Sequence, residues 1–274
     1  MTPIKTVSQV FDAIQQAKAG APDFCTNFFP VQRRLQEWID REELKGDFRD
    51  GASFYFRKDR GFHHLYFCAA SRSALNREIT CMPELKSERM VLDLVGNETV
   101  LNGMLALWES AGFRRYTRLY RMARPSQPET AAAANGESPV AFADKADCGG
   151  IQALLEGGFD RYGEQLPTSY EIEAAVESRQ ILIARYDGRI GGLLFFETQG
   201  FTSMLRFWLV APECRALRFG SALMRQYFAT QNSVRRFVLW VATDNLDAVQ
   251  KYRHYGYAPD GLVDYVLANE LIRS

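Results

Sequence analysis

Residues 207–224 limit the fold of this chain more than any other stretch of its sequence. They begin as an apolar, strand-like run, turn at Pro212, pass through a loop that carries Arg215 and Arg218, and continue as a helix-like pattern. A loop that opens directly into a helix presents several unpaired backbone N–H groups at the positive end of the helix dipole. Such a site suits a pyrophosphate, and the two arginines add positive charge to it. The alternative is an ordinary helix start after a surface turn.

Apolar periodicity around this stretch predicts a mixed α/β domain. Residues 180–186 and 189–197 are two apolar runs joined at Asp187-Gly188, which is a strong hairpin signal. Further strands are expected near 140–142, 203–210, 237–241 and 263–267, and helices near 148–155, 170–176, 219–230 and 246–255. Strands and helices therefore alternate after an antiparallel start. The expected fold is a mixed, mostly antiparallel, twisted sheet with helices on both faces.

A change of composition after Arg124 predicts a domain boundary. Residues 125–139 are small and polar, with a proline at each end and no large apolar residue, which is linker composition. Since 274 residues allow two domains of ordinary size, we expect domains at 1–124 and 139–274, joined by a linker at 125–138. The alternative is a single domain in which the alanine-rich residues 129–134 form a short helical turn.

The first half of the chain repeats part of the pattern of the second half. Residues 54–67 resemble 181–196, and residues 91–95 and 108–113 resemble 237–241 and 252–257. This indicates an internal duplication, although a chance likeness of two hairpins is the alternative. Asp59 lies 53 positions before Gly112, whereas Asp187 lies 69 positions before Gly256. The missing piece falls where the second copy has residues 212–230, so the first copy is expected to lack the pyrophosphate loop.

Composition excludes several classes of partner. The 33 basic residues balance the 33 acidic ones, so no overall field attracts nucleic acid or an anionic membrane. No segment approaches the ~20 apolar residues of a membrane span, and the first residues lack a secretory signal, so we expect a cytoplasmic protein. The five cysteines are scattered and the three histidines add no ligand spacing. Neither a metal site nor a disulfide framework is therefore expected.

The loop and the segment 238–257 resemble the GNAT (GCN5-related N-acetyltransferase) family. The family's acyl-CoA signature, Arg/Gln-x-x-Gly-x-Gly/Ala, reads here as Arg215-Ala-Leu-Arg218-Phe-Gly220 followed by Ser221. The later segment has an asparagine at its helix start and ends in Tyr252-Arg-His-Tyr-Gly-Tyr, as the family's does. One position departs from the signature, because Arg218 replaces its first glycine. The change either reshapes the site or lets the guanidinium contact a phosphate.

This resemblance implies a GNAT-type fold for residues 139–274 and a tandem of two related domains. In the family, acyl-CoA lies where two neighbouring strands separate, and its pantetheine pairs with exposed strand backbone. The main chain of Leu209 and Val210 would supply that backbone, and Asn245 would contact the cofactor, although it is also an ideal helix cap. The pyrophosphate would be held by Arg215, Ala216, Leu217, Arg218, Phe219, Gly220 and Ser221.

Tyr252 matches the family's tyrosine, and the resemblance implies that it also contacts the cofactor. A phenol beside the sulfur can donate a hydrogen bond or a proton to the departing thiolate; the alternative is a buried core aromatic. The general base is less clear, because the strand that often carries an acid in the family has Arg206 instead. We take Glu197 as the catalytic candidate, with Asp160 and Glu164 as alternatives.

We therefore expect an N-acyltransferase that moves an acetyl or short acyl group from acyl-CoA to a primary amine by direct attack in a ternary complex. The acceptor would be a small-molecule amine, an amino-acid-like molecule or a peptide, and acetyl-CoA or another acyl-CoA would be the cosubstrate, without a metal. The alternative is a CoA-responsive binding or regulatory protein with little or no transferase activity. A further possibility is that the first half recognises a protein or an aminoacyl-type substrate.

Overall fold

The computed structural model describes residues 1–126 and 139–273. Contacts divide the chain into two units: unit 1 comprises Met1–Leu119 and Leu262–Ser274, and unit 2 comprises Tyr120–Gly261. These limits differ from the predicted domains, since residues 120–124 lie in unit 2 and residues 262–274 in unit 1. Most of the predicted linker, residues 127–138, lies outside the described residues. The domain boundaries stay a prediction.

The elements of unit 1 are β1 (Thr2–Pro3), α1 (Val7–Lys18), β2 (Cys25–Thr26), α2 (Gln32–Asp40), β3 (Leu44–Arg49), β4 (Ala52–Asp59), β5 (Phe62–Ala69), α3 (Arg72–Thr80), α4 (Glu84–Ser87), β6 (Met90–Gly96), α5 (Glu98–Ser110) and α10 (Glu270–Arg273). Those of unit 2 are β8 (Val140–Phe142), η1 (Lys145–Asp147), α6 (Cys148–Gly158), α7 (Ser169–Glu177), β9 (Ile181–Tyr186), β10 (Arg189–Gln199), β11 (Thr202–Val210), η2 (Pro212–Leu217), α8 (Phe219–Thr230), β12 (Arg236–Ala242) and α9 (Leu246–His254). The strands β7 (Phe113–Pro125) and β13 (Ala258–Asn269) are divided between the units.

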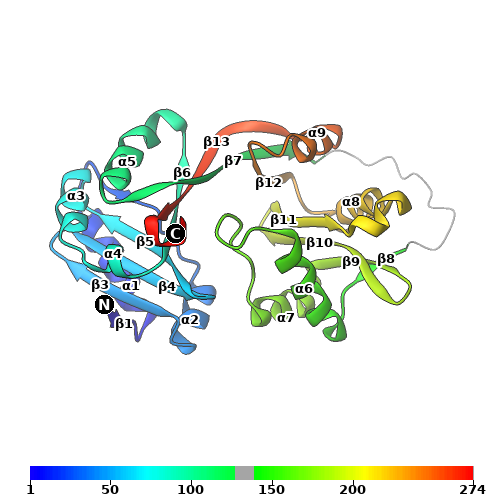
Figure 1. Ribbon diagram of the computed structural model, residues 1–274, viewed down its shortest axis with the longest axis horizontal. Coiled ribbons are helices and arrows are strands. Elements are labelled where there is room, and N and C mark those ends of the chain that lie inside the picture. Colours follow the sequence, from blue (N-terminus) through cyan, green and yellow to red (C-terminus); the bar gives the residue numbers. More distant parts are fainter. Residues whose placement is uncertain (127–138, 274) are drawn as a thin grey trace. The chain divides into compact units, whose positions relative to one another are not determined.

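Unit 2 is a sheet covered on both faces. Its strands follow the order β12-β11-β10-β9-β8, with α6 and α7 over one face and α8 and α9 over the other (Figure 1). Each face has its own apolar core, which contains Leu155 and Phe207 on one side and Leu205 and Tyr227 on the other. The predicted hairpin is confirmed. Tyr186 pairs with Arg189, and the two turn residues, Asp187 and Gly188, both have positive φ, as a tight two-residue turn requires.

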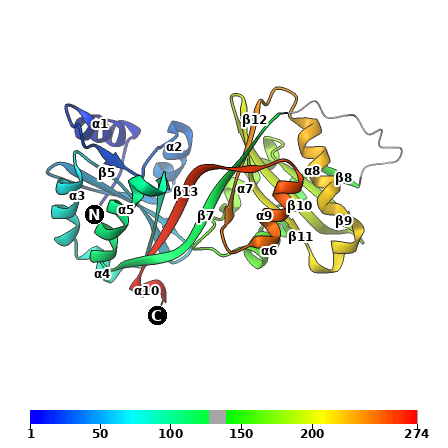
Figure 2. The ribbon, with the colours of Figure 1, turned by 90° about the horizontal axis from the view of Figure 1, so that it is seen from above.

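Unit 1 is built in the same way. Its strands follow the order β1-β3-β4-β5-β6-β13, and β2 pairs with β5 outside this path. Helices α1 and α2 pack on one face through a core that contains Val10, Leu35 and Tyr55, and α3 and α5 lie on the opposite side (Figure 2). Thr6 caps α1 in a capping box with Gln9, which explains why the helix begins at Val7.

The two units share an order of elements. The succession β4, β5, α3, β6, α5 and β7 in the first half matches β10, β11, α8, β12, α9 and β13 in the second. Residues 54–67 lie in β4 and β5 and so match β10 and β11, whereas the sequence comparison aligned them with 181–196, which lie in β9 and β10. The gap counted along the sequence was therefore shifted by one strand. The first copy keeps, as α3, the helix that this gap included. What it lacks is the connection before that helix: only Ala70 and Ser71 separate β5 from α3, whereas residues 211–218 separate β11 from α8.

The end of the chain belongs to unit 1. Residues Val263 to Ala268 of β13 pair in antiparallel register with Gly96 to Val91 of β6. The buried side chain of Asn269 accepts a hydrogen bond from the Met90 N–H (3.1 Å) and donates to the carbonyl oxygens of Leu85 (3.0 Å) and Glu88 (2.6 Å). These bonds satisfy three main-chain groups next to β6 and hold the last strand in place.

The predicted fold class is confirmed, since the described strands form one large, mostly antiparallel sheet within a mixed α/β fold. In the described part of the chain, no helix is long and apolar enough to cross a membrane.

Candidate active site

The parallel strands β11 and β12 of unit 2 separate part of the way along their length. They pair from Thr202↔Arg236 to Leu205↔Leu239 and no further, although both strands continue. Beyond Leu205, the described residues of β11 pair only with β10, up to Gly192↔Val210. One edge of the segment 206–210, which includes Leu209 and Val210, therefore presents main-chain N–H and C=O groups that no strand of residues 1–126 or 139–273 pairs with.

A β-bulge at Arg206 marks the start of this separated segment. Phe195 pairs with Phe207 but Phe196 pairs with Leu205, so Arg206 is the extra residue. The bulge inverts the alternation of side chains: Leu205 faces the core under α8, whereas Phe207 faces the core under α6. Bulges of this kind redirect side chains next to sites.

The bulge residue ties the strand to the loop 159–167. The Arg206 guanidinium donates to Glu197 (Nη1 to Oε1, 2.5 Å) and to the backbone carbonyl of Gln165 (Nη2 to O, 3.2 Å). Glu197, the carboxylate favoured by the sequence as the base, is thus held in an ion pair in which Arg206 is mostly buried. A carboxylate that accepts a charged hydrogen bond is a weaker proton acceptor.

The predicted phosphate loop joins β11 to α8 as a short 3₁₀ helix, Pro212–Leu217. Arg218 follows in the left-handed region, with φ 59° and ψ 21°, and stands as the N-cap of α8. This conformation favours glycine, which explains why the family signature has glycine there, and an arginine adopts it at a cost of about 1 kcal/mol.

No side chain caps the N-terminus of α8 within the described structure. The first helical hydrogen bond runs from the Ala222 N–H to the Arg218 carbonyl (3.1 Å), so the amides of Phe219, Gly220 and Ser221 precede it. Arg215 and Arg218 are exposed beside them. The loop therefore combines open N–H groups, a helix dipole and two guanidinium groups, which together suit an anionic ligand.

Gly220 brings this helix start close to β11. A Cβ atom there would lie 3.1 Å from Cζ2 of Trp208 and 3.6 Å from Cγ2 of Val210. The buried indole Nε1 of Trp208 has no hydrogen-bond partner among the described residues. The sequence analysis did not single out Trp208. Its position directly before Leu209 and Val210, the predicted backbone contacts of the cofactor, was the signal that could have identified it.

Asn245 serves as the N-cap of α9, where its Oδ1 accepts the Ala248 N–H (3.1 Å). This is one of the two roles that the sequence left open, and a cofactor contact stays a prediction.

Tyr252 lies on α9 and is 8% exposed. Its ring centroid is 5.7 Å from that of Trp208. Burial, and secondly the negative charge of Glu164, raise the pKa of the Tyr252 phenol above its ordinary value of 10. The group therefore stays protonated near neutral pH and can act as a hydrogen-bond donor.

Glu164 is the most perturbed carboxyl group near this tyrosine. Burial is the main cause that raises its pKa from 4.5 to about 7; the charge of Asp160 adds to the effect and that of Arg206 opposes it. Asp160 organises the loop, because its Oδ1 accepts the N–H groups of Tyr162 (2.9 Å) and Gly163 (2.8 Å) and its carbonyl accepts that of Glu164 (3.1 Å). A carboxyl with a pKa near 7 is well matched to proton transfer at neutral pH.

The described residues contain no group of three or more His, Cys, Asp or Glu side chains arranged to hold a metal ion.

Comparison with known proteins identifies residues 151–257 as a domain of the acetyltransferase (GNAT) family. No curated protein matches the chain. Among solved structures, a tandem GNAT protein from the clavulanic acid biosynthesis pathway is similar over 96% of this chain and 94% of its own (11% identity, TM-score 0.59). A Drosophila protein is similar over 96% of both chains, with 13% identity and a TM-score of 0.58. A GCN5-related N-acetyltransferase from Sphaerobacter thermophilus matches over 96% of this chain and 91% of its own (15%, 0.56).

Proposed function

Since residues 151–257 form a GNAT domain, we propose that this chain transfers an acetyl or short acyl group from acyl-CoA to a primary amine by direct attack in a ternary complex. One observation carries the proposal: the pairing of β11 and β12 stops at Leu205↔Leu239, directly beside a helix start that no side chain caps within the described structure. Acyl-CoA has a pantetheine arm with two amides and a pyrophosphate, which are the groups that such an edge and such a loop can bind.

The described residues fit this cosubstrate. The main chain of Leu209 and Val210 would hold the pantetheine amides, because none of the described strands pairs with that edge of β11. The loop from Arg215 to Ser221 would hold the pyrophosphate. Arg218 supports this assignment in an unusual way, since its backbone adopts the conformation of the signature glycine while its guanidinium adds a charge.

Two side chains would handle the protons. Bound acyl-CoA supplies the thioester that the amine attacks. Glu164, rather than the ion-paired Glu197, would accept the proton of the attacking amine, because its pKa of about 7 leaves it largely ionised just above neutral pH. Tyr252 would donate a hydrogen bond to the departing sulfur and stabilise the thiolate, because its raised pKa keeps the proton on the phenol.

Titration calorimetry with acetyl-CoA tests the binding step. We expect wild type to bind and Arg215→Ala/Arg218→Ala to bind at least about ten-fold more weakly, the loss expected when charge-assisted hydrogen bonds are removed. Arg225→Ala is the matched control, because Arg225 is exposed on the same helix away from the loop. Equal affinities in all three proteins would refute the placement of the pyrophosphate.

Thiol release with a panel of primary amines tests the chemistry. We expect turnover with at least one amine, and slower turnover of the same amine by Tyr252→Phe (about ten- to 100-fold) and by Glu164→Gln (at least about 100-fold). Tight acetyl-CoA binding with no turnover on any amine beyond slow thioester hydrolysis would instead support a CoA-responsive binding or regulatory protein. No binding of acetyl-CoA by wild type would overturn both functions.

A further inference from the structure

Unit 1 also contains two parallel strands that separate, and a segment of the same chain fills the space between them. Strands β5 and β6 pair only at His63↔Met90 and His64↔Val91. Past this point β2 lies against β5, where Cys25 pairs with Ala69 and Thr26 with Cys68. Unit 2 has the corresponding separation between β11 and β12, where no described strand enters.

The side chain of Asn27 completes this filling. Its Nδ2 donates to the carbonyl oxygens of Leu65 on β5 and Asp93 on β6, both at 3.1 Å, and its Oδ1 accepts the Phe67 N–H at 2.7 Å. Thr26 Oγ1 donates to the Phe67 carbonyl at 2.6 Å. The main-chain groups that would pair with a pantetheine arm are therefore already bonded. Unit 1 also lacks the loop that would hold the pyrophosphate, since Ala70 and Ser71 alone precede α3.

A pocket of about 740 Å³ lies beside this filled space, within unit 1. Much of its wall is apolar and comes from Phe67, Leu94, Leu101 and Met104. Phe29, which is 76% exposed, also lines it. The rest of its wall is polar and includes Thr26, Asn27 and Ser73, so the pocket combines apolar and polar surface in a volume large enough for a small molecule.

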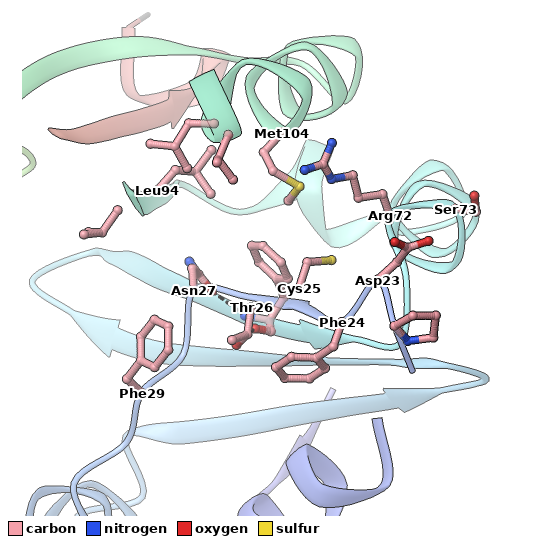
Figure 3. Close-up of a pocket in the computed structure, with 15 residues that line it drawn as sticks. Asp23, Phe24, Cys25, Thr26, Asn27, Phe29, Arg72, Ser73, Leu94 and Met104 are labelled. Carbon is pink, nitrogen blue, oxygen red and sulfur yellow. Dashed lines mark hydrogen bonds between the residues drawn. The ribbon is translucent and has the colours of Figure 1, made fainter. Parts of the chain in front are cut away.

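Two opposite charges stand in the same pocket. Arg72 and Asp23 both line it, and Figure 3 shows them on one side of it, with Leu94 on the other. Among the described residues, neither side chain has a hydrogen bond or an ion pair. Both charges act on one neighbour: burial mainly raises the pKa of the Cys25 thiol to about 11, while Arg72 lowers it and Asp23 raises it. Both residues are exposed, so water solvates the two charges when no ligand is bound. An accessible cation and an accessible anion beside apolar wall residues are complementary to a ligand that carries both charges and an apolar body.

We propose that the pocket of unit 1 binds a zwitterion with an apolar side chain, that is, an apolar α-amino acid or a short peptide of such residues. The ligand's carboxylate lies on Arg72, its ammonium group on Asp23, and its side chain against Leu94, Leu101 and Met104. Acyl-CoA does not fit the same place, because its several negative charges would face Asp23 and the strand edges beside it are occupied by Asn27.

Calorimetry on the full chain with four ligands tests this assignment. The ligands are L-leucine, the dipeptide Leu-Leu, leucinamide, which lacks the carboxylate, and 4-methylpentanoate, which lacks the ammonium group. We expect L-leucine or the dipeptide to bind. The one that binds more tightly shows whether the pocket takes a free amino acid or a short peptide. Removal of either charge from the ligand should weaken binding by about ten-fold or more.

Matched variants connect each charge to its residue. Arg72→Gln should weaken the binding of L-leucine and 4-methylpentanoate about ten-fold and leave that of leucinamide unchanged. Asp23→Asn should weaken the binding of L-leucine and leucinamide and leave that of 4-methylpentanoate unchanged. Arg33→Gln and Asp12→Asn, on the exposed surfaces of α2 and α1, are the controls. Circular dichroism confirms that each variant is folded.

Three results would overturn the proposal. The first is that neither L-leucine nor the dipeptide binds folded wild type at millimolar concentration. The second is that Arg72→Gln and Asp23→Asn bind every ligand as the control variants do. The third is an acetyl-CoA titration whose stoichiometry falls by one site per chain in Arg72→Gln. None of these depends on transferase activity, so failure here is distinguishable from failure of the function proposed for unit 2.

Discussion

Replacing Glu164 with glutamine removes a carboxyl group whose pKa is raised from 4.5 to about 7, mainly by burial. Between these values the folded protein holds a proton that the unfolded chain has released. The free energy of unfolding of wild type therefore falls as pH rises through this window. At about 1.4 kcal/mol per pH unit, the loss amounts to about 3 kcal/mol. Glutamine does not ionise, so the free energy of unfolding of Glu164→Gln should not show this fall. Relative to wild type, the variant should therefore become about 3 kcal/mol more stable between pH 4.5 and pH 8.

Urea denaturation at several pH values measures this difference. Wild type and Glu164→Gln should have similar free energies of unfolding near pH 4.5 and should diverge as pH rises, with the variant more stable. Glu173→Gln, an exposed residue on α7, is the control and should follow wild type. A difference between Glu164→Gln and wild type that stays constant from pH 4.5 to pH 8 would refute the raised pKa and the reasoning from burial.

The same substitution tests the role in catalysis. If Glu164 accepts the amine proton, kcat/KM of wild type should rise as pH increases through about 7, because the ionised carboxyl is the active form. Glu164→Gln should lose this rise and at least about 100-fold in rate, whereas Glu197→Gln should keep it. The opposite pattern, with the rise lost in Glu197→Gln and kept in Glu164→Gln, would make Glu197 the base.

Three further substitutions follow from the geometry. Arg218→Gly should leave thermal stability unchanged or slightly raised, because it relieves about 1 kcal/mol of left-handed backbone strain, and calorimetry should show acetyl-CoA binding about ten-fold weaker because the guanidinium is lost. Tyr252→Phe should lower kcat by about ten- to 100-fold with the Kd for acetyl-CoA unchanged, since only the phenolic oxygen is removed. Asn269→Ala should lower the free energy of unfolding by about 2–4 kcal/mol, because three buried or partly buried bonds are lost; urea denaturation checks this against Asn102→Ala on the exposed face of α5.

The sequence predicted the parts of unit 2 that depend on local signals. The hairpin at Asp187-Gly188 needs positive φ at both positions, and the loop before α8 needs residues that end a strand and start a helix. These requirements act within a few neighbouring residues, so pattern and turn chemistry reveal them. The GNAT likeness of the later segment depends on the same kind of short-range pattern.

Features that depend on distant contacts were predicted less well. The helix α3 was expected to be missing, because residues 54–67 were aligned with 181–196 in β9 and β10, whereas in the structure they match β10 and β11. Neighbouring hairpins have similar local patterns, so the sequence alone did not fix this alignment. The pairing of β13 with β6 joins residues that are more than 160 positions apart, and no local pattern encodes it. The choice among Glu197, Asp160 and Glu164 as the base stays a prediction. The sequence could not weigh these carboxylates, because the burial of Glu164 and the ion pair between Glu197 and Arg206 arise only in the folded unit.

The two units differ in how the main-chain groups beside their separated strands are bonded. Separated strands leave main-chain groups without partners, and such groups are costly unless water, a ligand or another segment bonds them. In unit 2 the edge beyond Leu205 stays available and lies next to the loop that carries Arg215 and Arg218. In unit 1 the loop is reduced to Ala70 and Ser71, and Asn27 bonds both strands instead. A strand edge that no ligand bonds needs a partner from its own chain, and in unit 1 Asn27 is that partner.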